Sequence, residues 1–424
     1  MKPLARLSIV MVLGLVAALV PALTAAAAPK AVPTCADPSA PLTVEEQRLT
    51  RPAPVEVLGR SGFDTFAKVF TPALCLLTDA DLAAKAFRAQ GRGLWAAAVA
   101  RAQGRLPAGS LPVTDDRPLY WARLQLTKAV RQWTPAFPLS PAQRAGLLDT
   151  LDRSSRGQDS VDYPGRDVKR ILVSGFDPFQ LDIDIRRSNP SGATALALDG
   201  TTVETAAGPA RIETVTFPVL WGPFAQGVVE RTFLPRLGKV DMFTTISQGR
   251  VGRFDVERYN GRWRGGYPDN DNVSSTGVIP IPAGVPTVLP APEFVPTTLP
   301  YQDIVAADTG RFPVFDHTSV VEIPAGQTQP VTQPNGPTPG SAARQGGGGD
   351  YLSNEIAYRV TLLRDALGLR IPGGHLHTPV LQFGPGNTTE LTDPVFAANQ
   401  RDIIDQVRAV LVVAGGTLVR LPGI

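Results

Sequence analysis

The sequence of 424 residues is poor in the residue types that usually bind metals. It contains only two cysteines, Cys35 and Cys75, and three histidines, and no CxxC or HExxH motif occurs. A zinc site is therefore not expected, and no other feature indicates a cofactor. In an oxidising compartment the natural interpretation of two isolated cysteines is a single disulfide, although sequence alone does not establish the pairing.

A strong charge of either sign is also lacking. The chain has 41 basic and 38 acidic residues, a formal net charge of +3, and without Lys2 and Arg6 the two totals are 39 and 38. Such a balance argues against a nucleic-acid partner. With 43% hydrophobic and 19% charged residues, the composition is that of a globular protein, and the length suits two domains.

Only one apolar run is long, and it lies at the N-terminus. Lys2 and Arg6 give a basic start, Leu7 to Leu23 are mostly apolar, and Thr24 to Ala28 are small. This pattern predicts a signal peptide over residues 1–28 and a secreted or extracytoplasmic protein, with a single membrane anchor as the alternative. No later segment is apolar enough over a spanning length, so no stable anchor is expected after signal removal.

Residues 29–168 are expected to form an all-helical domain and a linker. Apolar residues recur at helical spacing in Asp79 to Ala102 and in Pro118 to Trp133. The segment Leu139-Ser140-Pro141 is typical of a helix cap followed by proline in the first turn. Polar residues from Ser154 to Asp167 indicate the linker. No chemical motif occurs in this region, which suggests a packing or docking role.

Residues 169–424 alternate between strand and helix patterns, which predicts an α/β domain with a mostly parallel twisted sheet. The expected strands are Arg170–Ser174, Ile212–Phe217 and Val240–Ile246, and the expected helices are Ser191–Leu198, Asp350–Leu367 and about Asp393–Val413. Residues Gly277–Pro300 are expected to be extended. A Pro-, Gly- and Gln-rich insertion at about 324–349 is expected to be a mobile loop.

The stretch Gly346 to Tyr358, GGGGDYLSNEIAY, opens a helix directly after a glycine run. Glycine lets the backbone approach another group closely, and the first helical turn carries the positive end of the helix dipole. A nucleophile with an oxyanion site can be built at such a place, and Ser353 is the candidate. The alternative is that Ser353 only caps the helix.

Several motifs, taken in order, resemble the pyroglutamyl peptidase I family of cysteine peptidases. They are GFDPF at Gly175–Phe179, the turn Asn189-Pro190-Ser191, QGRVGRFDVER at Gln248–Arg258 with Pro268-Asp269-Asn270, the helix start Gly349–Tyr358, and His377-Thr378-Pro379. The resemblance extends over about residues 169–424. It implies a three-layer α/β fold, a peptide substrate with an N-terminal pyroglutamate, no cofactor, and assembly into homo-oligomers.

The resemblance also implies the roles of individual residues. Glu257, Ser353 and His377 stand where the family has its catalytic Glu, Cys and His. The residues implied to bind the substrate are Phe176, Phe179, Asn189, Gln248, Tyr351 and Leu352. A nucleophile, an imidazole and a carboxylate that orients the imidazole form the minimum set for acyl transfer. His375 is the rival base, but we expect it to be a packing residue that faces away from His377.

The chain departs from the family pattern in two ways. The nucleophile is a serine, whose hydroxyl depends wholly on its base, and Gly266 stands where the family has an oxyanion arginine, so Arg262 and Arg264 are the candidates to replace it. Two hypotheses follow: an exported Ser-His-Glu hydrolase, or a catalytically silent protein that binds pyroglutamyl peptides or acts as a scaffold. A Gly-x-Ser-x-Gly motif is absent, which argues against an α/β-hydrolase esterase.

Overall fold

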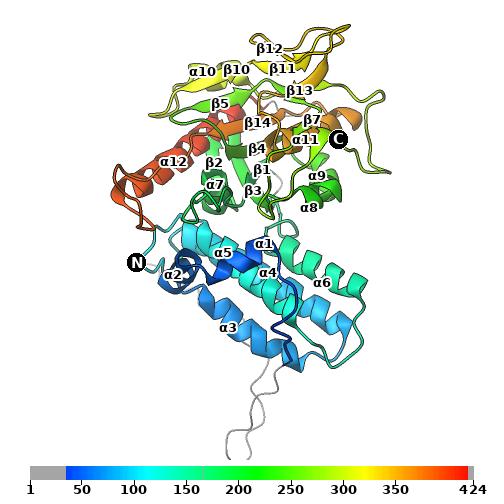
Figure 1. Cartoon of the computed structure of the whole chain (residues 1–424). Helices are drawn as coiled ribbons and strands as arrows, with labels where there is room; N and C mark the ends of the chain where they lie inside the picture. Colours follow the sequence, from blue (N-terminus) through cyan, green and yellow to red (C-terminus); the bar gives the residue numbers. More distant parts are fainter. Residues whose placement is uncertain (1–34, 166, 419–424) are drawn as a thin grey trace, which may run out of the picture. The chain divides into compact units, whose positions relative to one another are not determined.

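The computed structural model describes residues 35–165 and 167–418, and these form a helical region followed by an α/β region (Figure 1). From Cys35 onward the chain forms one compact unit. The expected signal peptide, residues 1–28, lies outside the described residues. Among the helices that the structure describes, none combines the length and the apolar character needed to cross a membrane.

The helical region is built from α1 to α6 around one core. These helices are α1 Val44–Gln47, α2 Pro52–Ser61, α3 Asp64–Ala73, α4 Ala80–Ala102, α5 Arg117–Gln132 and α6 Pro141–Ser154. Helix α6 begins as expected, because the Ser140 hydroxyl accepts from the Gln143 N–H and Pro141 occupies the first turn. Trp95, Trp121 and Trp133 are buried in the core. The prediction of a helical N-terminal region is confirmed.

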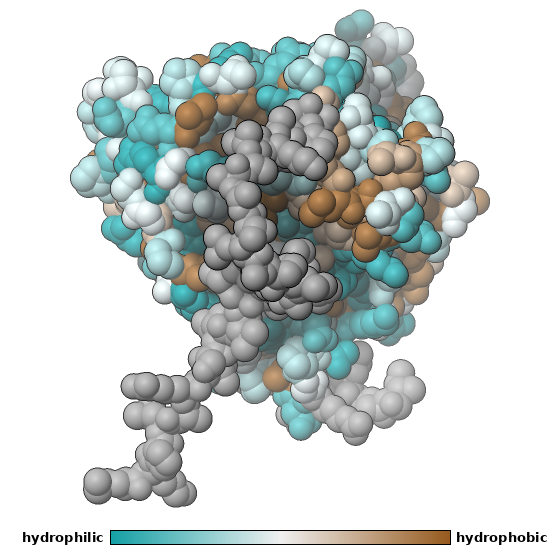
Figure 2. All heavy atoms as spheres, turned by 90° about the horizontal axis from the view of Figure 1, so that it is seen from below, coloured by the Kyte–Doolittle hydropathy of each residue, from teal (hydrophilic) through white to brown (hydrophobic). Residues whose placement is uncertain are grey.

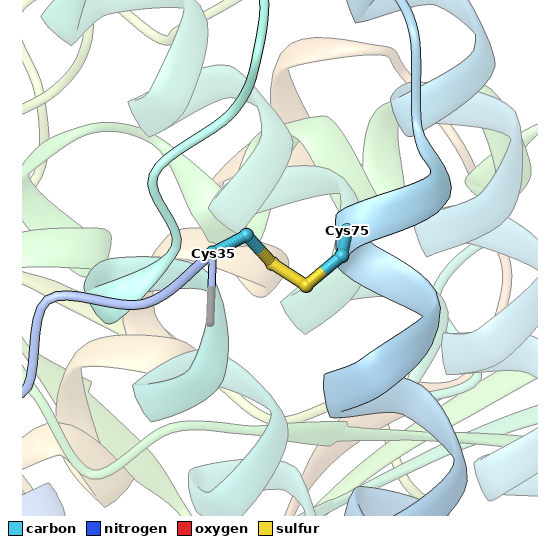
Figure 3. Close-up of a disulfide and its surroundings, with 2 residues drawn as sticks. All are labelled: Cys35 and Cys75. Carbon is cyan, nitrogen blue, oxygen red and sulfur yellow. A yellow bond between two sulfur atoms is a disulfide. The ribbon is translucent and has the colours of Figure 1, made fainter. Parts of the chain in front are cut away.

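Cys35 and Cys75 form a disulfide in this region (Figure 3). The bond has an S–S distance of 2.04 Å and joins residues 40 positions apart. It ties the beginning of the described chain to a short 3-10 turn, Leu74–Leu76, that follows α3. The segment at Cys35 is also fixed by the Thr134 N–H, which donates to the Cys35 carbonyl at 2.7 Å.

The α/β region contains a seven-stranded sheet in the order β10-β5-β14-β4-β1-β3-β2. Its strands are β1 Lys169–Phe176, β2 Thr201–Thr205, β3 Gly208–Phe217, β4 Met242–Gln248, β5 Phe254–Glu257, β10 Val314–His317 and β14 Gly373–Thr378. Neighbouring strands are parallel except at the pairs β5–β14 and β2–β3. The prediction of a mostly parallel sheet is therefore confirmed, and the β2–β3 hairpin is an addition that the sequence pattern does not reveal.

Helices cover both faces of this sheet and give three layers (Figure 1). Along β1, Ile171 and Val173 pack in the core that includes α12, Pro394–Gly416, whereas Leu172 packs in the core that includes α9 and α11. The bounds of the remaining helices of the region are α7 Pro190–Leu198, α8 Trp221–Ala225, α9 Val228–Leu237, α10 Tyr301–Ala306 and α11 Leu352–Ala366. Because β1 packs against a core on each face of the sheet, its residues form a continuous apolar run in the sequence.

The insertion at residues 324–349 contains two strands that the sequence does not predict. Strands β12, Val331–Gln333, and β13, Ala342–Gln345, flank β11, Val320–Ile323, in an antiparallel sheet. Two further pairs of short strands lie between the motifs: β6 Tyr259–Gly261 with β9 Phe294–Pro296, and β7 Trp263–Gly265 with β8 Thr276–Val278. Buried Glu322 holds the insertion together, because it accepts from the Ser341 hydroxyl at 2.6 Å and the Thr338 N–H at 2.8 Å.

The surface of the described residues mixes hydrophilic and hydrophobic side chains. Figure 2 shows one face, seen from below, with brown hydrophobic patches among teal residues. Exposed large apolar residues of the helical region include Val55, Val69, Leu76 and Leu82. Single exposed apolar residues of this kind are common on soluble proteins and do not by themselves mark a binding surface.

We expect the double variant Cys35→Ser/Cys75→Ser to unfold more easily than the native protein. A bond that closes a loop of 40 residues restricts the unfolded chain, and its removal costs about 2 to 4 kcal/mol in proteins generally. The test compares the midpoints of thermal unfolding of three samples: the oxidised native protein, the reduced native protein and the double variant. Equal midpoints for all three would contradict a stabilising disulfide.

Candidate active site

A carboxylate and an imidazole meet within the main sheet where β5, β14 and β4 lie side by side (Figure 1). Glu257 ends β5 and His377 lies on β14, and the His377 Nδ1 is 2.7 Å from the Glu257 Oε1. Both side chains are buried. This contact leaves the Nε2 of His377 as the ring nitrogen that can act on a nucleophile, which is the arrangement of a catalytic His-acid pair.

A second imidazole, which the sequence analysis did not select, binds the same carboxylate. His317 ends β10, next to β5, and its Nδ1 is 2.6 Å from the Glu257 Oε2. The guanidinium of Arg250 lies 3.2 Å from the His317 Nε2, and because an arginine only donates, Nε2 is the acceptor in this contact and Nδ1 faces Glu257. The only signal in the sequence is that His317 is one of three histidines.

These donors keep Glu257 ionised. Burial raises the pKa of its carboxyl, but hydrogen bonds from His317 and His377, together with the positive charge of these imidazoles, outweigh burial and lower the pKa to about 2. Asp255, which precedes Glu257 on β5, is also buried and binds Arg250 at 2.8 Å. The site therefore holds a fixed negative charge beside the His377 ring, which favours the protonated imidazole that forms when His377 takes a proton.

A pocket of about 280 Å³, a volume that includes its open mouth, lies at the start of α11. The side chains that line it are Phe176, Phe179, Asn189, Val219, Ser247, Gln248, Tyr351, Leu352 and Ser353. The structure thus brings together in one place all six residues that the sequence analysis associates with substrate binding, and it adds Val219 and Ser247. They come from the ends of β1 and β4, the segments that follow β1 and β3, the start of α7 and the start of α11.

Ser353 lines the pocket, but its hydroxyl is bonded away from His377. The Ser353 hydroxyl donates to the Gly348 carbonyl at 3.0 Å, and within residues 35–165 and 167–418 no hydrogen bond joins it to His377. Both residues nevertheless lie near Gly348, since Ser353 binds its carbonyl and a Cβ placed on Gly348 would lie 3.5 Å from the His377 Cε1. Catalytic contacts are often made only in the complex with substrate.

The glycine run before α11 packs directly against the Glu257 carboxylate. A Cβ on Gly347 would lie 2.3 Å from the Glu257 Oε2, so no other residue fits there without moving Glu257. Gly349 has a φ of +84°, in the left-handed region that glycine adopts readily. Glycine is therefore required at these positions for the backbone to approach Glu257 closely, in agreement with the expectation for a glycine run before a helix.

The two arginines considered as oxyanion donors do not line the pocket. Arg264 is buried and makes a two-pronged ion pair with Glu355, with both N–O distances at 2.6 Å. Arg262 is not among the pocket residues either. The remaining donors are backbone N–H groups in the first turn of α11, whose N-cap residue Tyr351 makes no capping bond with its side chain. Such groups bind developing negative charge well.

His375 does not face away from His377, so that expectation was wrong. Residues two apart on a strand point to the same side, and the two rings lie 4.6 Å apart at an angle of 84°. His375 is fully buried, and its ring nitrogens bind the hydroxyls of Thr245 and Ser247. Burial and the neighbouring His377 lower the pKa of His375 well below its usual value, so its ring stays neutral.

The helical region supplies two buried acids that hold loops of the site, which the sequence did not indicate. Asp116 accepts from the N–H of pocket residue Asn189 at 3.0 Å, and Glu45 accepts from the amide of Asn270 at 2.9 Å. Burial raises the pKa of Asp116 to about 7 and that of Glu45 to about 8. In the neutral form these groups are held by hydrogen bonds rather than by charge.

Together the fold and the site define an α/β protein with a carboxylate–imidazole pair on a mostly parallel sheet and a small pocket beside it. The chain belongs to the PA0049 family: residues 25–152 match its N-terminal domain, and residues 170–298 and 311–382 match its C-terminal domain. The Pseudomonas aeruginosa protein PA0049 is 34% identical to this chain over 89% of its length and 90% of that protein.

Solved structures with a similar fold include two peptidases. A mutant pyrrolidone carboxyl peptidase from Pyrococcus furiosus is 22% identical, and the match covers 59% of this chain and 100% of that one with a TM-score of 0.40. Pyroglutamyl peptidase I from Bacillus amyloliquefaciens is 20% identical, and the match covers 60% of this chain and 100% of that one with a TM-score of 0.39. These similarities concern the fold alone.

Acidification should lower the unfolding free energy of the native protein more than that of the variant Glu257→Gln. The pKa of Glu257 is about 2 in the folded protein and 4.5 as its ordinary value, so its contribution is complete above about pH 4.5 and is lost as the pH falls toward 2. Between pH 6 and 3.5 we expect the native protein to lose about 1 kcal/mol more unfolding free energy than Glu257→Gln in urea titrations.

Glu213→Gln is the matched control for this measurement. Burial, followed by the nearby charge of Asp199, raises the pKa of Glu213 to about 7. A raised pKa affects stability in the opposite direction. The contribution of Glu213 to the unfolding free energy is present at low pH and is lost as the pH rises through 7. The control variant should therefore lose at least as much stability on acidification as the native protein. Identical losses in native protein and Glu257→Gln would contradict the role assigned to Glu257.

Proposed function

We propose that this protein is an exported hydrolase that removes N-terminal pyroglutamyl groups from peptides, with Ser353 as nucleophile, His377 as base and Glu257 as the group that orients His377. The observation that supports this most directly is the 2.7 Å contact of Glu257 with His377, beside a pocket that Ser353 lines together with Phe176 and Phe179. The motif order described above supports the same assignment.

The pocket has a chemical character that suits a small flat ring. Phe176, Phe179, Val219 and Leu352 supply apolar surface, and Gln248 and Ser247 supply polar atoms. A five-membered lactam has two apolar faces and one polar edge that carries an N–H and a C=O. A small, mostly apolar pocket with few polar groups is the usual form of a site that recognises such a ligand.

In the proposed reaction, the Ser353 hydroxyl turns from the Gly348 carbonyl to the Nε2 of His377. The Ser353 oxygen attacks the carbonyl carbon that joins the pyroglutamyl group to the next residue, and His377 takes the hydroxyl proton. The ionised Glu257 stabilises the resulting imidazolium through Nδ1. The negative charge on the substrate oxygen is then bound by N–H groups at the start of α11.

Collapse of this intermediate breaks the peptide C–N bond. His377 returns its proton to the departing amine, and the pyroglutamyl group stays as an ester on Ser353. A water molecule, deprotonated by His377, then attacks the ester carbonyl and releases free pyroglutamate, with the proton returning to the Ser353 oxygen. Each proton thus leaves and returns through one imidazole, and no cofactor takes part in the step.

A catalytically silent binding protein is the second candidate, and two observations favour it. The Ser353 hydroxyl is bonded to Gly348 rather than to His377, and Arg264 is bound by Glu355 and Ser275. A hydroxyl is a weak nucleophile unless a base contacts it, and loss of one oxyanion donor costs about 100- to 1000-fold in rate. On this hypothesis the pocket binds pyroglutamyl peptides without cleaving them.

Ser353→Ala should abolish cleavage of pyroglutamyl aminomethylcoumarin, with a loss of at least about 1000-fold in kcat/KM, because the proposed nucleophile is gone. Ser39→Ala, an exposed serine of the helical region, is the matched control and should keep native turnover. Release of the coumarin is measured by fluorescence. Equal turnover in native protein and Ser353→Ala would exclude Ser353 as the nucleophile.

Ser353→Cys separates the two candidates. A thiol is partly ionised near neutral pH and is intrinsically more nucleophilic than a hydroxyl. If the pocket and the His377–Glu257 pair are competent, this variant should cleave the same substrate. An inactive native protein with an active Ser353→Cys variant would identify the silent binding protein, whereas activity in neither would contradict the pair as catalytic machinery.

A further inference from the structure

A second hydroxyl–imidazole pair lies in the wall of the pocket. Ser247 lines the pocket, and its Oγ is 2.8 Å from the Nε2 of His375. The Nδ1 of His375 is in turn 2.8 Å from the Oγ1 of Thr245. The three side chains meet because β4 and β14 are parallel neighbours in a register that pairs His375 with Thr245. All three are buried.

The direction of these hydrogen bonds follows from a fourth group. The Oγ1 of Thr245 is also 3.2 Å from the carbonyl oxygen of Gly374, which can only accept. We therefore assign the Thr245 proton to that carbonyl, so that Thr245 accepts from His375 Nδ1–H. A neutral imidazole has one N–H, which leaves the Nε2 of His375 to accept the proton of the Ser247 hydroxyl.

This chain does not activate Ser247 as a nucleophile. The His375 ring is backed by the Thr245 hydroxyl and not by a carboxylate, so an imidazolium formed there would lack the partner that Glu257 gives to His377. Complete burial also disfavours the charged form of His375. His375 can hold the Ser247 proton in a hydrogen bond, but it is poorly suited to remove it.

The consequence for the pocket is that Ser247 offers only lone pairs. Its single proton is directed to His375, so the Ser247 oxygen acts as an acceptor toward a ligand. The side-chain amide of Asn189 is already bound, since its Nδ2 donates to the Asp177 carbonyl at 2.9 Å and its Oδ1 accepts from the Ser191 N–H at 3.1 Å. Gln248 uses its Oε1 to accept from the Leu381 N–H at 3.4 Å, which leaves its NH₂ as the donor end.

We propose that Ser247 is a specificity-determining residue that accepts a hydrogen bond from the ring N–H of a lactam ligand, and that His375 is the positioning residue that keeps Ser247 an acceptor. This inference rests on the proposed function. It identifies the N–H as the group that distinguishes the ligand from rings of the same shape. In a ring with an oxygen in place of the N–H, the lone pairs of that oxygen would face the lone pairs of the Ser247 oxygen, and no hydrogen bond could form.

Binding of two matched ligands tests this without depending on turnover. The ligands are pyroglutamide and its lactone counterpart, in which the ring N–H is replaced by oxygen, and titration calorimetry is done on the full chain carrying Ser353→Ala so that neither ligand is consumed. We expect the lactam to bind roughly 10- to 100-fold more tightly than the lactone, because the lactone leaves a buried acceptor unpaired. Equal affinities would overturn the proposal.

Ser247→Ala, added to the same chain, should reduce the preference for the lactam to less than about threefold, mainly through weaker lactam binding. Ser247→Cys, which keeps the volume but is a weak acceptor, serves if the alanine variant fails to fold, and it should also reduce the preference. A preference unchanged in these variants would overturn the role of Ser247.

His375→Phe tests the positioning role with Ser247 still present. Without the ring nitrogen, the Ser247 hydroxyl is free to rotate and donate, so the lactone should bind better and the preference should fall. A merely structural role of His375 would weaken both ligands equally, and that result would overturn the positioning assignment. Failure of both ligands to bind the Ser353→Ala chain would overturn this inference and the pyroglutamyl pocket together. The expected preference without native turnover would refute only the hydrolase.

Discussion

The site depends on how a buried carboxylate is satisfied. Glu257 has almost no contact with solvent, so its charge must be stabilised by hydrogen-bond donors, and one imidazole binds each of its oxygens. The donors come from strands on both sides, because β5 lies between β10 and β14 in the sheet. This strand order places an acid between two histidines.

Three other buried acids in the protein show the opposite behaviour. Burial raises the pKa of Glu45, Asp116 and Glu213, whereas the two imidazoles lower that of Glu257. The difference lies in the surroundings, since each residue type has a similar ordinary pKa. The protein thus uses the same functional group in two ways. Glu45 and Asp116 hold loops of the site by hydrogen bonds, and ionised Glu257 binds the imidazole of the proposed catalytic pair.

Much of the fold could be predicted from the sequence, because long apolar periodicity and helix caps are local signals. Helices α4, α6, α11 and α12 and strands β1, β3 and β4 lie close to their expected positions. Short strands such as β12 could not be predicted, since three residues of mixed composition carry no period. Likewise, the pocket residues follow from motif order, but His317 and Ser247 become notable only when β10, β5, β14 and β4 are adjacent.

The run Gly346 to Gly349 shows that a low-complexity stretch can carry as much positional information as a strand. Its four residues have the same identity but different tolerances: a Cβ on Gly346 would lie 2.2 Å from the Asn354 Oδ1, one on Gly347 would strike Glu257, one on Gly348 has room, and Gly349 is constrained by its φ. An alanine at Gly348 would therefore fit without a clash, whereas any side chain at Gly347 would require Glu257 to move. The residue at the position of Gly347 therefore indicates whether a relative of unknown structure can place a carboxylate where Glu257 lies in this protein.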